Sequence, residues 1–537
     1  MPIVKRNSFD VAVYNVANYG DTDIFPFPLE NHWFHDHHDA VVDFLMKIDD
    51  DFEEQLKVYP MHHVKNLAGV GYLGFRTATQ IDPIWNAYLL GLIIEIGDDI
   101  EAARIASTRD VVHAYRFCID KTKHTLFSND FGWGSYQRSA LKNARDSKYI
   151  LATDITDFYH RVYHHRLENA LNETTKNRVA VNRIMILLKR ISIGNSSYGL
   201  PVGGNAARIL AELLLNRVDK LLLARNFKFA RFVDDYYIFA NSREDAQRAL
   251  IFLSESLQVE GLSIARAKTR LMSKAEFLRS SPVAEVTVAE SETEAEAREF
   301  LKLRLTYDPY SLTGDDDYNK LSRELERFNI VGMLAKEIHK SRVDEALIRQ
   351  LIKSVRFLGA GIREQAVDSI IRNIEVLYPV FPTIAILLKR ISSDIDSEAL
   401  KIAYAKLREM LRLQSHVILV PTNLAFIVRL LAYDDDEESD SLLIQVYERS
   451  GVSPTIRRDV LLAMARRRAG YWLSDKLHHF VEVTPWERRA LIVASYSLGD
   501  EGRHWRSNNR SQRNEIEELF LKWVADKNNG KNWEIPL

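Results

Sequence analysis

The sequence predicts an α+β domain followed by an all-α domain. Up to about residue 280, helical and short strand-like patterns alternate, with glycine-rich turns between them. From about residue 297 onward, no strand pattern is convincing. The small, acidic segment SSPVAEVTVAESETEAEA lies between the two parts and has the composition of a connector. We therefore expect domains at 1–280 and 297–537, joined by a connector at 281–296.

Length and composition are those of a globular protein without membrane spans. The 537 residues are enough for two or three domains, and 46% hydrophobic with 27% charged residues is an ordinary balance. The start, MPIVKRNSFD, lacks the apolar core of a signal peptide, and no run of about 18 uncharged apolar residues occurs. These observations predict a cytoplasmic protein with no membrane partner.

Charge and cysteine content exclude two classes of function. Cys118 is the single cysteine, so the chain forms no internal disulfide and has no thiolate-rich zinc site. The net charge of −2 argues against tight, sequence-independent binding of long duplexes, which depends on many Lys and Arg contacts with phosphates.

The stretch FARFVDDYYIFA, residues 229–240, places two aspartates between two aromatic and aliphatic runs. These runs predict two strands joined by a tight turn, with Asp234 and Asp235 at the hairpin tip. Two adjacent carboxylates repel each other, and a divalent cation in front of them would remove the repulsion. A plain Asp-Asp turn is the alternative for the motif taken alone.

A third carboxylate and a glycine-rich loop precede this hairpin. In KYILATDITDFYHRVYHHRL, a buried strand at 149–153 is followed by Asp154, which lies 234 − 154 = 80 residues before Asp234. That spacing lets neighbouring antiparallel strands bring the three carboxylates together after a helical excursion. The excursion contains YGLPVGGNAARILAELLLNRVD, in which Gly199 and Gly203 allow a close backbone approach to a ligand and Asn205 opens a helix. The segment GLSIARAKTRLM then supplies Lys268.

In this order, the four motifs resemble those of reverse transcriptases. The Phe232–Asp235 stretch is similar to their Tyr/Phe-x-Asp-Asp signature, Asp154 to the palm aspartate, and Gly199-Leu200-Pro201 with Gly203 to the Leu-Pro-x-Gly loop. Flanking stretches resemble one branch, the bacterial and phage-borne defence polymerases of the abortive-infection (Abi) type. These stretches are GDTDIFPFPLE at 20–30, FRTATQIDPIWNAYL from 75, YRF at 115–117 and ARILAE at 207–212. The resemblance covers roughly residues 15 to 275 and implies a fingers and palm domain.

The resemblance implies nucleotidyl transfer with deoxynucleoside triphosphates as substrates and two Mg²⁺ ions as cofactors, for which Mn²⁺ is expected to substitute. Asp154 and Asp234 would bridge the metals, and Asp235 would be a further ligand or would orient the others. Tyr159 corresponds to the position that excludes a 2′-hydroxyl in related enzymes, and Asp157 would cap the following helix. The residues expected to bind the nucleotide are Asp157, Phe158, Tyr159, Gly203 and Lys268.

Two departures from the family pattern bear on template use. Val202 stands where a polar residue commonly follows Leu-Pro, and Ala207 stands where a serine often precedes Arg-x-Leu-Ala. Abi polymerases are associated with untemplated, protein-primed synthesis, so we expect a single-stranded DNA product attached covalently to a tyrosine. Tyr14 and Tyr19 are candidate primers in an N-terminal segment that we expect to be mobile. A template-copying reverse transcriptase, a palm-like nucleotidyl cyclase and a catalytically silent interaction protein are the alternatives.

The C-terminal part carries an internal similarity. SPTIRRDVLLAMARR begins at Ser453 and TPWERRALIVASYSL at Thr484, and each combines an N-cap residue, a proline, two arginines and an apolar helix. GAGIREQAVDSIIRN from Gly359 is a weaker copy. The pattern resembles HEAT-type repeats, which stack helix pairs and offer faces for a homo-oligomer.

Overall fold

The computed structural model describes residues 3–20, 24–192, 196–280, 292–303, 305, 314–340, 342–529 and 533–537. The predicted connector at 281–296 therefore lies mostly outside the described residues. The chain divides into two compact units. The first comprises residues 1–23, 27–63 and 79–288, and the second comprises 24–26, 64–78 and 289–537. Among the described residues, no helix is both long enough and apolar enough to cross a membrane.

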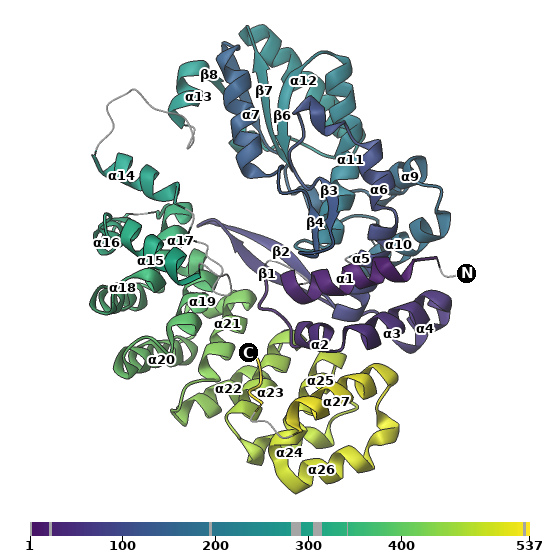
Figure 1. The fold of residues 1–537 in the computed structure, drawn as a ribbon, viewed down its shortest axis with the longest axis vertical. Coiled ribbons are helices and arrows are strands. Elements are labelled where there is room, and N and C mark those ends of the chain that lie inside the picture. Colours follow the sequence, from purple (N-terminus) through teal and green to yellow (C-terminus); the bar gives the residue numbers. More distant parts are fainter. Residues whose placement is uncertain are drawn as a thin grey trace. The chain divides into compact units, whose positions relative to one another are not determined.

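The first unit contains a four-stranded antiparallel sheet, whose strands β6 and β7 lie between α7 and α12 in Figure 1. Its strand order is β6-β7-β5-β8, which pairs distant segments of the chain. In register, Ala152 lies opposite Tyr237 on β7 and opposite Arg270 on β8, and Phe232 pairs with Asp235 across the hairpin. The strands of this sheet are β5 (Tyr149–Thr153), β6 (Lys228–Phe232), β7 (Asp235–Ala240) and β8 (Arg270–Ser273).

Helices cover both faces of this sheet because β5, β6 and β7 bury apolar side chains on both sides. The helix α7 (Trp133–Arg145) places Tyr136 and Ala140 on one face, against Ile150 and Phe239. The helices α11 (Asn205–Ala224) and α12 (Arg243–Val259) lie on the other face, and α12 contacts β5 and β7. The carboxylates at the strand ends are thereby held by a packed layer rather than by mobile loops.

The N-terminal segment is a packed helix and not the mobile segment that the sequence suggested. The helix α1 (Arg6–Tyr19) buries Phe9, Val13 and Val16 and packs against α2, α3 and α5. Its apolar positions recur at helical spacing, which explains why the segment is ordered. The remaining elements of the first unit are α2 (Glu30–Asp36), α3 (His38–Asp50), α4 (Phe52–Val58), α5 (Pro83–Glu95), α6 (Gly97–Ala103), η1 (Ser107–Arg109), β3 (Phe117–Asp120), β4 (Thr125–Phe127), α8 (Phe158–Arg161), α9 (His164–Thr174), α10 (Arg178–Ile191), η2 (Arg266–Lys268) and α13 (Lys274–Ser280).

In its described residues, the second unit is helical apart from one strand pair. The strands β1 (His63–Val70) and β2 (Gly74–Ile81) contribute residues 64–78 to this unit. Asn66 donates a hydrogen bond to the Ser453 hydroxyl (3.2 Å), and the Tyr72 hydroxyl donates to the carbonyl of Val376 (3.0 Å). Hydrogen bonds between residues about 300 to 390 positions apart thus join the strand pair to the helices, and no local pattern predicts them.

Successive helices of the second unit pack in two series, α17-α19-α21-α23-α25-α27 and α16-α18-α20-α22. Ser453 and Thr484 are N-caps with proline in the first turn, as predicted, and Thr484 forms a capping box with Glu487. The assignment to HEAT-type repeats stays a prediction. The helices of this unit are α14 (Glu292–Leu301), α15 (Gly314–Leu325), α16 (Ile330–Ile338), α17 (Glu345–Ser354), η3 (Val355–Phe357), α18 (Ala360–Arg372), η4 (Tyr378–Val380), α19 (Phe381–Ile391), α20 (Ser397–Arg412), η5 (His416–Leu419), α21 (Pro421–Leu431), α22 (Glu438–Glu448), α23 (Pro454–Arg466), α24 (Gly470–His478), α25 (Pro485–Ala494), η6 (Ser495–Leu498), α26 (Gly499–Asn508), η7 (Arg510–Gln512) and α27 (Glu515–Asn528).

Candidate active site

Asp154 directly follows β5, a central strand of the sheet. Asp154 is only 5% exposed, and its main-chain carbonyl accepts a hydrogen bond from the N–H of Ala265 (2.7 Å). The following residue, Ile155, donates its N–H to the carbonyl of Asp234 (3.2 Å). Main-chain hydrogen bonds therefore hold Asp154 beside the hairpin that carries the other two aspartates.

Asp234 and Asp235 lie at the tip of the β6–β7 hairpin, as predicted. The turn residues are Val233 and Asp234, and Asp235 already begins β7 opposite Phe232. Val233 has a φ of +54°, which places a β-branched residue in the left-handed region. Such a conformation costs roughly 1–2 kcal/mol and persists only where the surroundings impose it.

Arg231 imposes this conformation, and its role was not predicted from the sequence. Its guanidinium is fully buried and donates to the carbonyl of Val233 (2.7 Å). The same group pairs with Glu212 (2.9 Å) and Asp219 (2.6 Å) on α11. Because the charges of a buried arginine must be compensated, this cluster fixes the hairpin on α11. The sequence does contain a signal for this cluster. It is an arginine inside the apolar strand FARF, together with acidic residues on an apolar helix.

The two hairpin aspartates resist ionisation in the metal-free protein. Burial, then the charges of Asp154 and Asp235, raises the pKa of Asp234 to about 7. Burial and the charge of Asp154 raise the pKa of Asp235 to about 6. Three carboxylates that share a small, partly desolvated space therefore lack sufficient compensating positive charge.

Lys268 supplies part of that charge. Its ammonium donates a hydrogen bond to the carboxylate of Asp154, and this bond raises the pKa of Lys268. The lysine side chain is 70% exposed, whereas the Asp154 side chain is 7% exposed, so the ammonium is free to move into solvent. Next to it, the hydroxyls of Thr153 and Thr269 share a hydrogen bond (2.8 Å) that holds η2 on β5. The predicted Lys268 thus reaches the carboxylates.

The predicted nucleotide-binding stretch lies close to the same carboxylates. Phe158 is buried, and burial holds the pKa of Tyr159 well above its usual range, with contributions from Tyr115 and Asp234. Asp157 occupies the N-cap position of α8, as predicted, but it is exposed at a φ of +49° and its side chain makes no capping hydrogen bond. Its carboxylate lies 3.9 Å from Arg161, one turn along this short helix.

The glycine-rich loop is hydrogen bonded to this stretch. Leu200 donates its N–H to the carbonyl of Tyr159 (2.8 Å), and Gly199 donates to the carbonyl of Val162 (2.9 Å). The His164 ring, through Nε2, hydrogen bonds to the carbonyl of Gly199 (2.7 Å). Burial lowers the pKa of His164, which keeps the ring neutral near pH 7. Gly203, at a φ of +117°, lies in the turn before α11, so its backbone conformation favours glycine.

The two candidate priming tyrosines lie on α1. The Tyr14 ring stacks between His38 and His124, with ring centroids 3.8 and 4.2 Å away. Tyr19 is 45% exposed, and its hydroxyl donates to the carbonyl of Lys123. Neither contact involves the aspartates, so priming by either tyrosine stays a prediction that requires movement or a second copy of the chain.

The donor set at the strand ends fits a hard divalent cation. Three carboxylates offer only oxygen ligands, and the raised pKa values of Asp234 and Asp235 reflect the missing positive charge. Within the described residues, only Asp10, His38 and Asp39 bring three metal-ligand atoms within 4.8 Å of one another. The carboxylate oxygens of Asp154, Asp234 and Asp235 do not all lie this close to one another. The Asp154 carboxylate instead accepts a hydrogen bond from the Lys268 ammonium.

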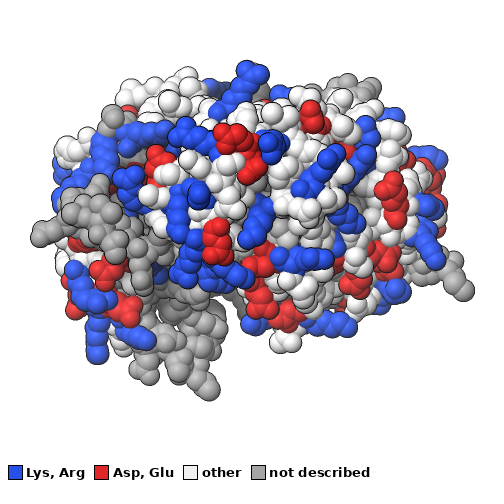
Figure 2. Space-filling view, turned by 90° about the horizontal axis from the view of Figure 1, so that it is seen from above, with Lys and Arg blue, Asp and Glu red and all other residues white. Residues whose placement is uncertain are grey.

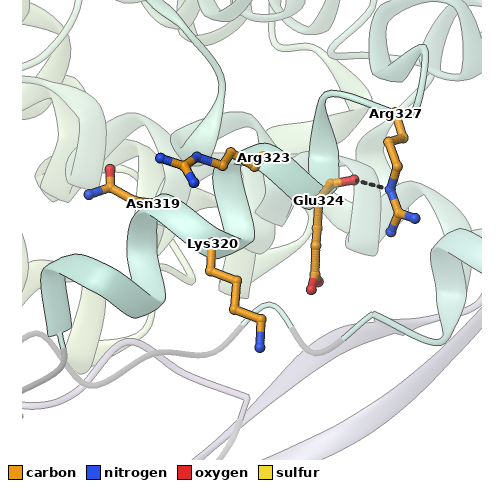
Figure 3. A pocket seen from close by; sticks show the side chains of 5 residues that line it. All are labelled: Asn319, Lys320, Arg323, Glu324 and Arg327. Carbon is orange, nitrogen blue, oxygen red and sulfur yellow. Dashed lines mark hydrogen bonds between the residues drawn. The ribbon is translucent and has the colours of Figure 1, made fainter.

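Two of the cavities formed by the described residues are lined by the second unit alone. One, of about 310 Å³, lies along α15 between Asn319 and Arg327, where Lys320, Arg323 and Glu324 extend into it (Figure 3). The other, of about 990 Å³, lies between the ends of α21, α23 and α25. No predicted site residue lines either cavity.

Comparison with known proteins identifies the domain that carries the aspartates. Residues 101–303 match the family model of reverse transcriptase (RNA-dependent DNA polymerase), and this segment contains Asp154, Asp234, Asp235 and Lys268. The chain therefore carries a reverse transcriptase domain in these residues.

Two telomerase structures show a weak likeness. Telomerase from Candida albicans, in complex with the TWJ fragment of telomeric RNA, is 11% identical with a TM-score of 0.30, and the match covers 67% of this chain and 66% of that chain. Apo telomerase from Candida tropicalis is 12% identical with a TM-score of 0.29, and the match covers 74% and 68%. The chain thus spans about two thirds of either telomerase chain. Curated proteins gave no match.

Proposed function

We propose that the protein is a DNA polymerase of the reverse transcriptase type that acts in phage defence by abortive infection. It adds deoxynucleotides by two-metal nucleotidyl transfer, needs no template and starts synthesis on one of its own tyrosines. The cytoplasm of a bacterial cell and a homo-oligomeric assembly belong to the same proposal. The observation that carries it is the convergence of Asp154, Asp234 and Asp235 on adjacent strand ends within a reverse transcriptase domain.

The chain's own residues bind and orient the reactants. When bound, two Mg²⁺ ions supply positive charge to the attacking and the departing oxygens. Asp154 and Asp234 would hold these ions, and Asp235 would be a further ligand or would orient the other two. Tyr159 lies beneath the sugar, where its ring leaves no room for a 2′-hydroxyl. Lys268, whose largely exposed ammonium donates to Asp154, would give a proton to the departing pyrophosphate.

The priming step balances as a phosphoryl transfer. A bond forms between the tyrosine oxygen and the α-phosphorus, the bond between the α-phosphorus and the bridging oxygen breaks, and pyrophosphate leaves. The phenolic proton passes to solvent. A tyrosine is a suitable nucleophile because its hydroxyl stands on a rigid stem, and a nearby divalent cation lowers its pKa as it does for a sugar hydroxyl.

The loop that would face a templating base supports untemplated synthesis. Val202 is 6% exposed and Ala207 is fully buried, so neither position presents a polar group there. The charge distribution is consistent with weak binding of long duplexes. Figure 2 shows Lys and Arg interspersed with Asp and Glu among the described residues of the face it presents, and the net charge is −2.

Incubation with labelled deoxynucleotides and Mg²⁺ in the absence of nucleic acid tests the proposal. The expected product is DNA that remains attached to the protein after denaturation, and mass spectrometry of nuclease-treated peptides identifies the modified tyrosine. Asp234→Asn serves as the matched control and should remain unmodified. Polymer that forms only when a template and a free 3′-end are supplied, with unmodified protein, would instead establish a template-copying reverse transcriptase, the activity that the family name describes.

A further inference from the structure

Three side chains with metal-binding atoms meet between α1 and α3, two helices of the first unit that pack against each other (Figure 1). Asp10 lies on α1, and His38 and Asp39 begin α3. Each offers one ligand atom, a ring nitrogen or a carboxylate oxygen, and these atoms lie within 4.8 Å of one another. The ligands of one ion stand about 3 to 4 Å apart, because each lies ~2.1 Å from the metal. Small rotations of the two carboxylates therefore suffice to bring all three ligands onto one ion.

The imidazole of His38 is held in one orientation. Its side chain is only 10% exposed, and Tyr14, one turn after Asp10 on α1, stacks on the ring with centroids 3.8 Å apart. Its Nε2 lies 3.3 Å from the main-chain carbonyl of Asp10, and a carbonyl only accepts, so Nε2 carries the proton. A histidine that binds a metal through one nitrogen almost always donates the other N–H to such an acceptor. Nδ1 is therefore the nitrogen that is available to an ion.

Nδ1 faces a second acceptor. It lies 3.3 Å from a carboxylate oxygen of Asp39. When Nε2 carries the only proton of a neutral imidazole, Nδ1 presents a lone pair to this oxygen, and two acceptors repel each other. A cation between them removes the repulsion, either a second proton on the ring or a divalent metal. The carboxylate of Asp10, with an oxygen 4.0 Å from Nε2, adds further negative charge and favours the ion of higher charge.

Arg6 supplies part of the charge that these carboxylates need. Its guanidinium pairs with Asp43 and lies 4.0 Å from Asp39. The hydrogen bond to Asp43, together with the charges of Asp10 and Asp39, raises the pKa of Arg6. The Arg6 side chain is 47% exposed and that of Asp39 is 88% exposed, so their long contact is lost at little cost when Asp39 turns to an ion. Arg6 therefore lowers the affinity for a cation without blocking the site.

We propose that Asp10, His38 and Asp39 bind a divalent ion of the zinc class, which joins α1 to α3. A set of one imidazole and two carboxylates suits Zn²⁺, and water completes the coordination. Mg²⁺ prefers oxygen ligands alone and gives up its water reluctantly, so it suits this set poorly. The site therefore differs in chemistry from the three carboxylates at the strand ends, and zinc binding here is independent of the proposed polymerase activity.

Isothermal titration calorimetry with ZnCl₂ tests the site. Asp234→Asn serves as the parent chain, because it lacks a carboxylate of the strand-end site that also attracts divalent ions. The parent should bind Zn²⁺ at α1 and α3, and an excess of Mg²⁺ should not displace it. Asp39→Asn should weaken this binding by at least roughly 10- to 100-fold, the cost of losing even an outer-shell partner. Because Asp39 is 88% exposed, this change leaves the metal-free fold intact. His38→Gln should weaken binding as strongly.

Two further variants sharpen the comparison. His35→Gln is the matched control, since His35 is an exposed histidine whose ring lies 3.1 Å from its neighbour Asp36. This pair repeats the contact of His38 with Asp39 outside the three-ligand cluster, so His35→Gln should bind Zn²⁺ as the parent does. Arg6→Gln should bind Zn²⁺ more tightly than the parent, by up to about 5-fold, which is the size of an exposed ion-pair interaction.

Thermal melting gives a second readout. Excess Zn²⁺ should raise the melting temperature of the parent more than that of Asp39→Asn, because binding to the folded state adds stability. Equal Zn²⁺ affinity in the parent, Asp39→Asn and His38→Gln would mean adventitious binding by surface side chains and would overturn the proposal. Absence of Zn²⁺ binding by the parent, or an equal loss of affinity in His35→Gln, would overturn it as well. Circular dichroism in EDTA shows whether His38→Gln folds, and Asp39→Asn decides the matter if it does not.

Discussion

Replacement of Asp234 by asparagine should stabilise the metal-free protein at alkaline pH. The pKa of Asp234 is raised from 3.8 to about 7, first by burial and then by the charges of Asp154 and Asp235. Each tenfold change in a protonation equilibrium corresponds to about 1.4 kcal/mol, so this rise in pKa gives an upper bound near ~4 kcal/mol. Because the residue is partly exposed and its charge is coupled to two neighbours, we expect a gain of about 2–4 kcal/mol.

The sign of the effect depends on pH. Between about pH 4 and 7 the unfolded chain has lost this proton while the folded protein retains it, so the free energy of unfolding falls as the pH rises. Above about pH 7 the wild type bears the full free-energy cost of an ionised, largely buried Asp234, and Asp234→Asn does not. Near pH 4 the ionisation of this carboxyl group should contribute almost no difference between the free energies of unfolding of the two proteins.

Thermal melting at pH 5 and pH 8, with EDTA and with Mg²⁺, measures this effect. The gain at pH 8 should raise the midpoint by on the order of 5 to 15 °C, and it should be smaller at pH 5. Mg²⁺ should stabilise wild type more than Asp234→Asn, because binding to the folded state adds stability. Asp130→Asn, an exposed aspartate in a loop, is the matched control. Equal gains at both pH values, or equal stabilisation of both proteins by Mg²⁺, would refute the reasoning.

Four further outcomes are expected. Asp154→Asn should abolish nucleotide incorporation with an unchanged circular dichroism spectrum, and full activity would remove Asp154 from the metal site. Tyr159→Ala should admit ribonucleotides in a competition assay, whereas an unchanged preference with normal activity would exclude this gate. Arg231→Met should lower the free energy of unfolding by about 3–5 kcal/mol, because it leaves the buried Asp219 without a counter-charge and Glu212 with Arg104 alone, and a denaturant midpoint equal to that of wild type would contradict this. A truncation that ends near residue 290 should be insoluble or inactive, and a soluble, active product would show that the helical unit is dispensable.

Local patterns were sufficient to predict the strands and carboxylates of the candidate site. The buried strand before Asp154, and the aromatic runs around Asp234 and Asp235, are short segments whose periodicity and polarity are read directly from the residues. The turn is displaced by one residue from the aspartate pair, since Val233 takes the first turn position. The sequence therefore predicted the place of the hairpin to within one residue, but not the left-handed conformation of Val233.

Contacts between distant segments were not predictable in the same way. The left-handed Val233 depends on Arg231, whose charge is compensated by Glu212 and Asp219 on a helix that precedes it. The membership of residues 64–78 in the helical unit depends on contacts such as that of Asn66 with Ser453. No periodic pattern encodes such pairs, because each partner is ordinary within its own segment.

Incorporation of labelled deoxynucleotides in Mg²⁺ tests the central claim most directly. Wild type, Asp154→Asn and wild type with EDTA are compared, and the products are separated by size and by treatment with protease and nuclease. The account predicts polymer that stays attached to protein in wild type with Mg²⁺ and no product in the other two reactions. A cyclic nucleotide would indicate a cyclase, and the absence of any product from folded wild type would contradict the assignment of the three aspartates as a catalytic metal site.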